Sequence, residues 1–350
     1  MGRSFLVLGL GTVLSCSCGS QEVRNPSTKG HPSCLPVEAG ATTCWRLVMP
    51  LGSGGFPSEP GSQDSPRWEP GRFPLGLQPV IAFNDDLWML SRTHAWSSSD
   101  GLTWAHVAKT DWGERIWHEV VYFDHNLWMY GGLRYADRVV QNDIWSSADG
   151  ASWTRVGEAA WSPRARHRVI AFGEKLWLFG GADRVTRDFT TEHMVNDVWS
   201  SDDGVLWVQR AAEAAFSPRE EAKVIAFGDG LLMLGAQGVA DVWRSPDGVT
   251  WTPLSSDPGY GPRNDFAVAV FAGRLWVYGG WRDTSTHGLN DIWTSADGVR
   301  WTRQTEHAPW GPRSPKTVVF KDRLWIYSGK HTGAPDNWGG DLWTMTADDG

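Results

Sequence analysis

The chain has 350 residues and a mass of 38.8 kDa, with 41% apolar and 21% charged residues. This composition can fill a sizeable core, and no run of 18 apolar residues could cross a bilayer as a helix, which excludes wholesale disorder and a polytopic membrane protein. A formal net charge of −8 argues against a surface that neutralises phosphates, so we expect no nucleic acid partner. Tryptophan is unusually frequent, with 24 residues, and the positions of side chains this large should reveal the architecture.

Residues 1–15 predict a secretory signal peptide. Arg3 precedes an apolar run at 5–14, which is too short for a stop-transfer helix. The sequence VLSC at 13–16 resembles the lipobox of bacterial lipoproteins, and this resemblance implies that Cys16 is acylated and becomes the new N-terminus. An ordinary cleaved signal peptide is the alternative.

The lipobox resemblance also predicts the compartment. Residues 16–41 would form a lipidated tether, and the lipid anchor would be the only membrane contact. Ser17 stands where an inner-membrane retention signal would have Asp. We therefore expect the bacterial cell envelope, at the outer membrane, with secretion as the alternative.

The four cysteines all lie within the first 44 residues. If Cys16 is acylated, Cys34 and Cys44 are close enough in sequence to form a disulfide in an oxidising compartment. Closing a loop of this size is worth roughly 3 kcal/mol on the chain-entropy model. Free thiols are the alternative, and Cys18 would be left over.

One sequence pattern recurs through the rest of the chain. Each copy opens with an aromatic residue, Gly or Ser, Pro and Arg, followed by an apolar run, a polar turn and Leu-Trp-apolar-aromatic-Gly-Gly. Asn-Asp-Ile/Val-Trp and Ser-x-Asp-Gly-x-x-Trp then complete the copy. Short apolar runs bounded by Gly, Asp and Asn are strand signals, so each copy predicts a four-stranded antiparallel meander.

The tryptophans count the copies. Most of them fall in three columns, which we assign to the second strand (Trp88, Trp128, Trp177, Trp276 and Trp325), the third strand (Trp96, Trp145, Trp199, Trp243, Trp293 and Trp343) and the fourth strand (Trp45, Trp104, Trp153, Trp207, Trp251 and Trp301). The third-strand column repeats every 44 to 54 residues, which is near the length of one propeller blade.

The fourth-strand column indicates how the ring closes. The last copy stops at Gly350 without a fourth strand, while the segment 42–48 resembles the fourth strand of the other copies. We therefore predict an all-β protein, a six-bladed β-propeller of four-stranded antiparallel blades whose ring is closed by this N-terminal strand. The expected propeller spans 42–350, with a loop at 49–74 and the blades at 75–350. An open solenoid, which would not need the complementing strand, is the alternative.

These motifs together resemble the kelch-repeat β-propellers. The resemblance covers residues 42–350 and implies the fold of the galactose-oxidase-like central domain, but it implies no activity, because propellers carry unrelated functions. Three copies depart from the diglycine, with Leu90-Ser91, Gly235-Ala236 and Ser328-Gly329 in its place. We expect these blades to pack a little differently.

The Ser-x-Asp-Gly-x-x-Trp segments also resemble the Asp-box of sialidase-type propellers, shortened by one residue. A glycosidase is one interpretation. The simpler one is structural, since Asp-Gly supplies a tight hairpin turn between the third and fourth strands.

The Pro-Arg motif supplies the candidate ligand-binding residues. The loops between blades share one face of a propeller, so the motif arginines and the aromatic residues before them should lie near the mouth of the central channel. Guanidinium groups beside aromatic rings would suit an acidic sugar or another carboxylate. The candidates are Arg115, Arg164, Arg219, Arg263 and Arg313, with Trp112, Trp161, Tyr260 and Trp310, and Phe216 at the equivalent position in the remaining copy.

The same arginines have an architectural alternative. Each of these copies also carries an aspartate two residues before the third-strand tryptophan, whereas the first copy has Leu75 and His94 at the two positions. The joint loss suggests that Arg and Asp pair within or between blades. The aspartates are Asp143, Asp197, Asp241, Asp291 and Asp341.

No catalytic constellation stands out in the sequence. A galactose-oxidase-like copper site needs a tyrosine crosslinked to cysteine, and the propeller body has no cysteine beyond Cys44. The histidines show no recurrent ligand spacing, so we expect neither a metal nor a cofactor. A mutarotase like the periplasmic six-bladed kelch epimerase of sialic acid needs only an acid and a base, for which the candidates are Glu114, Glu119, Glu220 and Glu221.

We therefore expect an envelope-anchored, monomeric binding module rather than an enzyme, with a glycan or protein partner on the face that bears the inter-blade loops. The sugar mutarotase is the alternative function. Trp281 and Trp338 lie outside the three tryptophan columns, in variable loops, and are candidates for a partner surface.

Overall fold

The computed structural model describes the backbone of residues 33–37, 41–49, 79–282, 288–327 and 342–346, and side chains from residue 79 onward. Within these ranges the regular secondary structure is all β. None of the described segments forms a helix that is long and apolar enough to cross a membrane.

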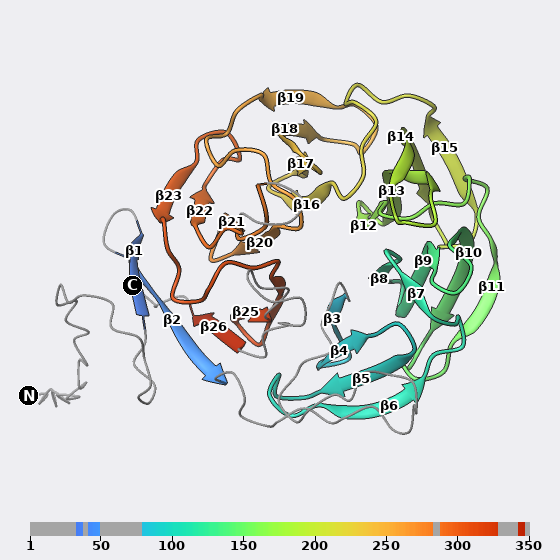
Figure 1. Ribbon diagram of the computed structural model, residues 1–350, viewed down its shortest axis with the longest axis horizontal. Helices are drawn as coiled ribbons and strands as arrows, with labels where there is room; N and C mark the ends of the chain where they lie inside the picture. Colours follow the sequence, from blue (N-terminus) through green and yellow to red (C-terminus); the bar gives the residue numbers. More distant parts are fainter. Residues whose placement is uncertain (1–32, 38–40, 50–78, 283–287, 328–341, 347–350) are drawn as a thin grey trace, which may run out of the picture.

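The strands form six antiparallel sheets that surround a central axis (Figure 1). From the inner to the outer strand, the first three blades contain β3 (Val80–Phe83), β4 (Asp86–Leu90), β5 (His94–Ser98) and β6 (Ala105–Lys109); β8 (Glu119–Phe123), β9 (Asn126–Arg134), β10 (Val139–Ser147) and β11 (Thr154–Glu158); and β12 (Arg168–Phe172), β13 (Lys175–Val185), β14 (Thr191–Ser201) and β15 (Trp207–Ala211).

The other three blades have the same order. They contain β16 (Lys223–Phe227), β17 (Gly230–Ala236), β18 (Val239–Ser245) and β19 (Thr252–Ser255); β20 (Ala267–Phe271), β21 (Arg274–Tyr278), β22 (Ile292–Ser295) and β23 (Thr302–Thr305); and β24 (Lys316–Phe320), β25 (Arg323–Tyr327), β26 (Leu342–Thr346) and β2 (Ala41–Met49).

The N-terminal strand closes the ring as predicted. β2 pairs with β26 in the sixth blade, with Trp45 opposite Met345. The inner strands contact one another in a closed cycle from β3 through β8, β12, β16, β20 and β24 back to β3. The prediction of a six-bladed propeller is therefore confirmed.

Two short strands were not expected from the repeat. β1 (Ser33–Val37) pairs with β2 and adds a fifth strand outside the sixth blade. β7 (Arg115–Ile116) pairs with the far end of β9, because β9 and β10 extend beyond the length of most other hairpins and leave backbone groups there to be paired. The hairpin β13–β14 is also long, so blades two and three carry the longest hairpins among the described segments.

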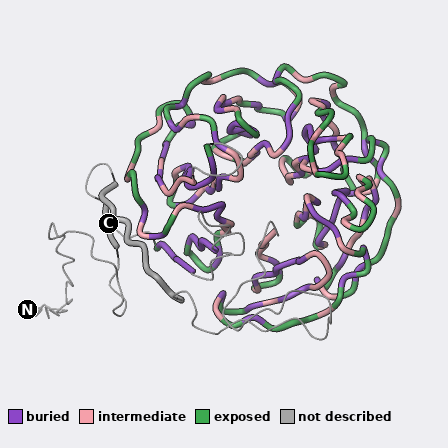
Figure 2. Tube along the Cα trace, viewed as in Figure 1, coloured by how far each residue is buried: buried purple, intermediate pink, exposed green. Residues whose placement is uncertain are grey.

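Neighbouring blades are fitted to each other by the second-strand tryptophans. Trp88 of the first blade lies against the Asp-Gly turn of the second, where a Cβ on Gly150 would come within 2.6 Å of the indole. The Asp-Gly turns of three other blades pack in the same way against Trp128, Trp177 and Trp325. Buried residues accordingly run through each blade, while exposed residues gather on the outer strands and turns (Figure 2).

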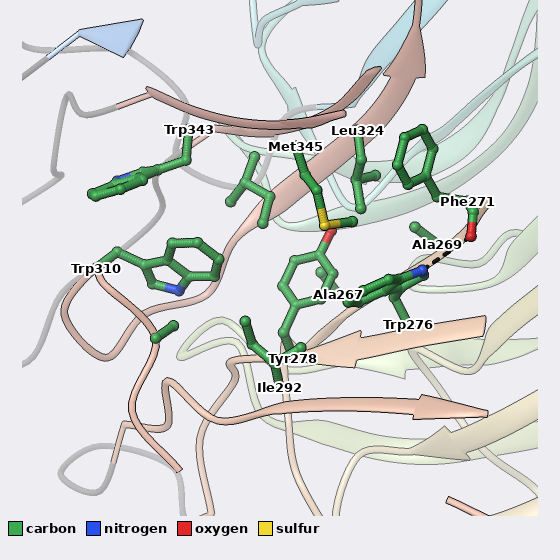
Figure 3. Close-up of a cluster of buried hydrophobic side chains, with 12 residues drawn as sticks. Ala267, Ala269, Phe271, Trp276, Tyr278, Ile292, Trp310, Leu324, Trp343 and Met345 are labelled. Carbon is green, nitrogen blue, oxygen red and sulfur yellow. Dashed lines mark hydrogen bonds between the residues drawn. The ribbon is translucent and has the colours of Figure 1, made fainter. Parts of the chain in front are cut away.

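The interface between the fifth and sixth blades shows the resulting core (Figure 3). Trp276, Tyr278 and Ile292 of the fifth blade pack with Leu324 and Met345 of the sixth. The indole N–H of Trp276 donates to the carbonyl of Phe271 at 3.0 Å, so the polar atom is paired while the ring is buried.

The Asp-Gly segments are hairpin turns. In the second blade the Asp149 carboxylate accepts the backbone N–H groups of residues 151 and 152 and the Ser147 hydroxyl, and that hydroxyl accepts the Gly150 N–H. These bonds stay inside the turn and account for the motif as a local structure.

Candidate functional site

The motif arginines lie inside the blades. Arg164 is 1% exposed and donates to both carboxylate oxygens of Asp197, at 2.6 and 2.8 Å, and to the carbonyl of Gly180 at 2.9 Å. The Trp199 indole donates to the same carboxylate at 2.7 Å. Bidentate pairing recurs between Arg115 and Asp143, Arg219 and Asp241, and Arg263 and Asp291.

This network uses the guanidinium donors within each blade. Arg313 is also buried, and its aspartate counterpart, Asp341, lies outside the described residues. The geometry corresponds to the architectural alternative, in which the arginine before the inner strand pairs with an aspartate at or next to the third strand of the same blade. Ligand contacts are therefore expected elsewhere on the channel.

The aromatic residues that open each motif are core residues. Their side chains are at most 3% exposed, and each lies near the fourth-strand tryptophan of its own blade where that residue is described, as Trp112 does with a ring distance of 4.6 Å to Trp153. The buried set comprises Trp112, Trp161, Phe216, Tyr260 and Trp310.

A left-handed residue follows two positions after the motif arginine. Trp117, Arg166, Glu221 and Asp265 have φ between 50° and 58°, a conformation that is uncommon for residues other than glycine. Backbone hydrogen bonds hold the positions in series around the ring, since Arg166 N–H donates to the Trp117 carbonyl and Glu221 N–H to the Arg166 carbonyl. Such outliers concentrate at functional sites.

These four side chains line one pocket at the channel. It has an empty volume of about 540 Å³, including the space open to solvent, and its walls come from successive blades. Three neighbouring blades each contribute three consecutive residues, and the next two contribute one each: Trp117, His118 and Glu119; Arg166, His167 and Arg168; Glu221, Ala222 and Lys223; Asp265; and Lys316.

Cationic side chains enter the pocket from the first residues of three inner strands. Arg168 begins β12 and donates to Glu119 at 2.9 Å. Lys223 begins β16 and Lys316 begins β24, and neither has a salt-bridge partner among the residues described. Burial and the charge of Lys316 lower the pKa of Lys223, while the nearby Glu221 and Asp265 oppose this shift.

The glutamates near the channel have different environments. Glu114 pairs with Arg92 at 3.1 Å in a half-exposed position, and Glu220 is held by Arg166 at 2.7 Å and Thr191 at 2.6 Å. Burial raises the pKa of Glu119, with Arg168 opposing the shift. Burial and the nearby Asp265 raise the pKa of Glu221 to about 7.

Two buried histidines complete the pocket. A Cβ added at Gly132 would lie 2.7 Å from the Cβ of His118, so the glycine, which lacks a side chain, leaves space for the histidine. Burial and the Arg115 guanidinium lower the pKa of His118 to about 3, and burial and Arg164 do the same for His167. Both rings are therefore neutral near pH 7. Neither ring nitrogen of His118 has a hydrogen-bond partner in the described part of the chain.

The comparisons with known proteins support the fold. No family model and no curated protein matches the chain. A solved structure described as the structure of YjhT is similar, with a TM-score of 0.63 and 16% identity over 79% of this chain and 96% of that chain. The chain folds as a six-bladed β-propeller whose sequence repeats resemble kelch motifs. At this identity the similarity shows the fold alone.

The sequence predicted Glu119 and Glu221 of this pocket, as candidate acid and base, but not its other residues. The signal was available, because residues two to four places after the motif arginine are charged or polar in several copies. A repeat pattern does not mark these residues as a site, because they differ from copy to copy.

The remaining candidates are placed as follows. Trp281 is 5% exposed, and its indole donates to Ser314, so it is buried in the fold. Cys34 lies directly opposite Cys44 in the pairing of β1 with β2. Trp338, Cys16 and Cys18 lie outside the described residues.

Proposed function

We propose that the protein is a binding module whose channel pocket takes a small acidic sugar. The observation that carries the proposal is the pair Lys223 and Lys316, two cations that line the pocket without a salt-bridge partner among the described residues. A ligand carboxylate between them would relieve their repulsion and replace the water lost on burial.

The rest of the pocket fits the same ligand. His118 and His167 line the pocket with their ring nitrogens buried, and Trp117 presents an aromatic surface beside them. Four cationic and three acidic side chains line the pocket, so its charge is opposite in sign to the net charge of −8 of the chain.

Calorimetry with N-acetylneuraminic acid, galacturonic acid and galactose tests the proposal. We expect the acids to bind and galactose not to bind, and Lys316→Met to weaken binding of the acids about tenfold or more, as the loss of a charge-assisted contact should. Lys109→Met, which removes an exposed lysine of the outer strand β6, is the control. Equal affinity for acids and galactose, or equal effects of the two variants, would contradict the proposal.

The second candidate function is mutarotation of the bound sugar. It is favoured by Glu221, whose pKa is raised to about 7, since a carboxyl group that titrates near the working pH can both donate and accept a proton during ring opening. Exchange between anomers, followed by NMR, should be accelerated by the protein and lost in Glu221→Gln. Acceleration that survives in Glu221→Gln would exclude Glu221 from this role.

The location in the cell envelope is part of the proposal. It rests on the leader at 1–15 and on the sequence VLSC that ends at Cys16. Mass spectrometry of the protein from its native membrane should find an acylated N-terminal Cys16, and Cys16→Ala should release the protein from the membrane. A cleaved, unmodified N-terminus would support secretion instead.

A further inference from the structure

A row of arginine and aromatic side chains in mutual contact leads from the first blade to the pocket. We define the arginine–aromatic stack as Arg92, Tyr135, Arg138, Phe189, Trp117 and Arg166. Successive members are in contact: the guanidinium carbons lie 3.6 to 4.6 Å from the ring centroids, and the rings of Phe189 and Trp117 lie 5.6 Å apart.

The long hairpins of blades two and three contribute three side chains to this stack. Tyr135 and Arg138 come from the turn of β9–β10, and Phe189 from the turn of β13–β14. Arg138 and Phe189 have φ of 62° and 68°, so the left-handed backbone seen at the pocket recurs in the stack. Non-glycine residues keep such a conformation only where the surroundings hold them there.

Arg138 is the member with unused binding capacity. Its guanidinium lies 3.9 Å from the Tyr135 ring centroid and 4.0 Å from that of Phe189. Of its five N–H donors, the described contacts use one, from Nη1 to the Tyr135 carbonyl at 2.6 Å. No carboxylate among the described residues pairs with it, since the nearby Asp137 is bound by Arg134 and Glu114 by Arg92.

We propose that the stack is a second binding subsite for the next units of an acidic oligosaccharide whose terminal unit occupies the pocket. This inference rests on the proposed function. The stack ends in Trp117 and Arg166, which also line the pocket, so one chain can contact both. A guanidinium without a carboxylate partner recognises a carboxylate through paired N–H donors, and the ring edges beside it contact the sugar.

Calorimetry with galacturonic acid and its α-1,4-linked trimer, and with sialic acid and its α-2,8-linked trimer, tests the subsite. We expect the trimer of the preferred acid to bind about tenfold tighter than its monomer, corresponding to one additional charge-assisted contact. Arg138→Gln should abolish this difference and leave the affinity for the monomer unchanged. Arg187→Gln, which removes an exposed arginine of the β13–β14 turn, should change neither affinity.

The outcomes separate the subsite from the pocket. If monomers bind and depend on Lys316 but trimers bind no tighter, the subsite is wrong and the proposed function stands. If Arg138→Gln and Arg187→Gln weaken trimer binding equally, the effect is general electrostatics and the subsite is again wrong. If neither acid binds as monomer or trimer, both proposals fail. The melting temperature of Arg138→Gln verifies that the variant is folded.

Discussion

Turn glycines show, at the scale of single residues, how tightly neighbouring blades fit. Gly150 has a φ of 76°, and a Cβ there would meet the Trp88 indole at 2.6 Å. Gly113 has the same φ with no atom within 4 Å of the added Cβ. Gly157, in β11, has similar open space without a positive φ. Substitutions at these three positions therefore measure the cost of backbone strain separately from the cost of a packing clash.

Substitution by alanine at these positions should give graded losses of stability. We predict that Gly150→Ala lowers the free energy of unfolding by about 2 to 4 kcal/mol, because it adds overpacking to left-handed strain. Gly113→Ala should cost about 1 kcal/mol from strain alone, and Gly157→Ala less than about 0.5 kcal/mol. Urea unfolding followed by tryptophan fluorescence measures all three. Equal losses for Gly150→Ala and Gly113→Ala would show that the turn does not press on Trp88.

At the scale of elements, the sequence predicted what the blades share and missed what distinguishes them. Buried Trp, Gly, Arg and Asp recur because every blade solves the same packing problem, so the strand order and ring closure could be read from the repeat. The pocket depends on positions where the copies carry different residues: the first residue of the inner strand is Lys223 or Lys316 in two blades but Glu119 or Ala267 in two others. The curvature of the ring decides which charged side chains lie close together in the channel. A repeat pattern carries no information about this curvature.

The fifth strand of the sixth blade gives a prediction for the two cysteines at its centre. Cys34 and Cys44 are direct cross-strand partners, a position that brings two Cβ atoms to about the separation a disulfide needs. We predict that peptide mapping of the unreduced protein finds these two residues linked. Cys34→Ser should lower stability by roughly 3 kcal/mol on the chain-entropy model. Alkylation of both thiols in the unreduced protein would contradict the prediction.

On the scale of the whole molecule, the channel couples stability to pH through buried groups of opposite sign. His118 and His167 have pKa values lowered to about 3, so the unfolded chain binds protons that the folded protein does not, and acid destabilises the fold below about pH 6.5. Glu221 has a pKa raised to about 7. The folded protein therefore binds its proton more tightly, and the stability that Glu221 contributes is lost as the pH rises from about 4.5 to 7.

Two histidines against Glu221, with a smaller opposing shift at Glu119, should make the free energy of unfolding rise with pH between about 4.5 and 6.5, by at most about 1.4 kcal/mol per pH unit. We predict that Glu221→Gln steepens this rise, because it removes the opposing group. Replacing His118 and His167 together by Gln should reverse its sign, since Glu221 then dominates. Denaturant unfolding from pH 4.5 to 7.5 measures the slopes, with Glu213→Gln, an exposed carboxylate, as the control. An unchanged slope in the double histidine variant would mean that these rings are protonated in the folded protein over this pH range. The pocket would then carry two additional positive charges at low pH and would bind acids more tightly as the pH falls.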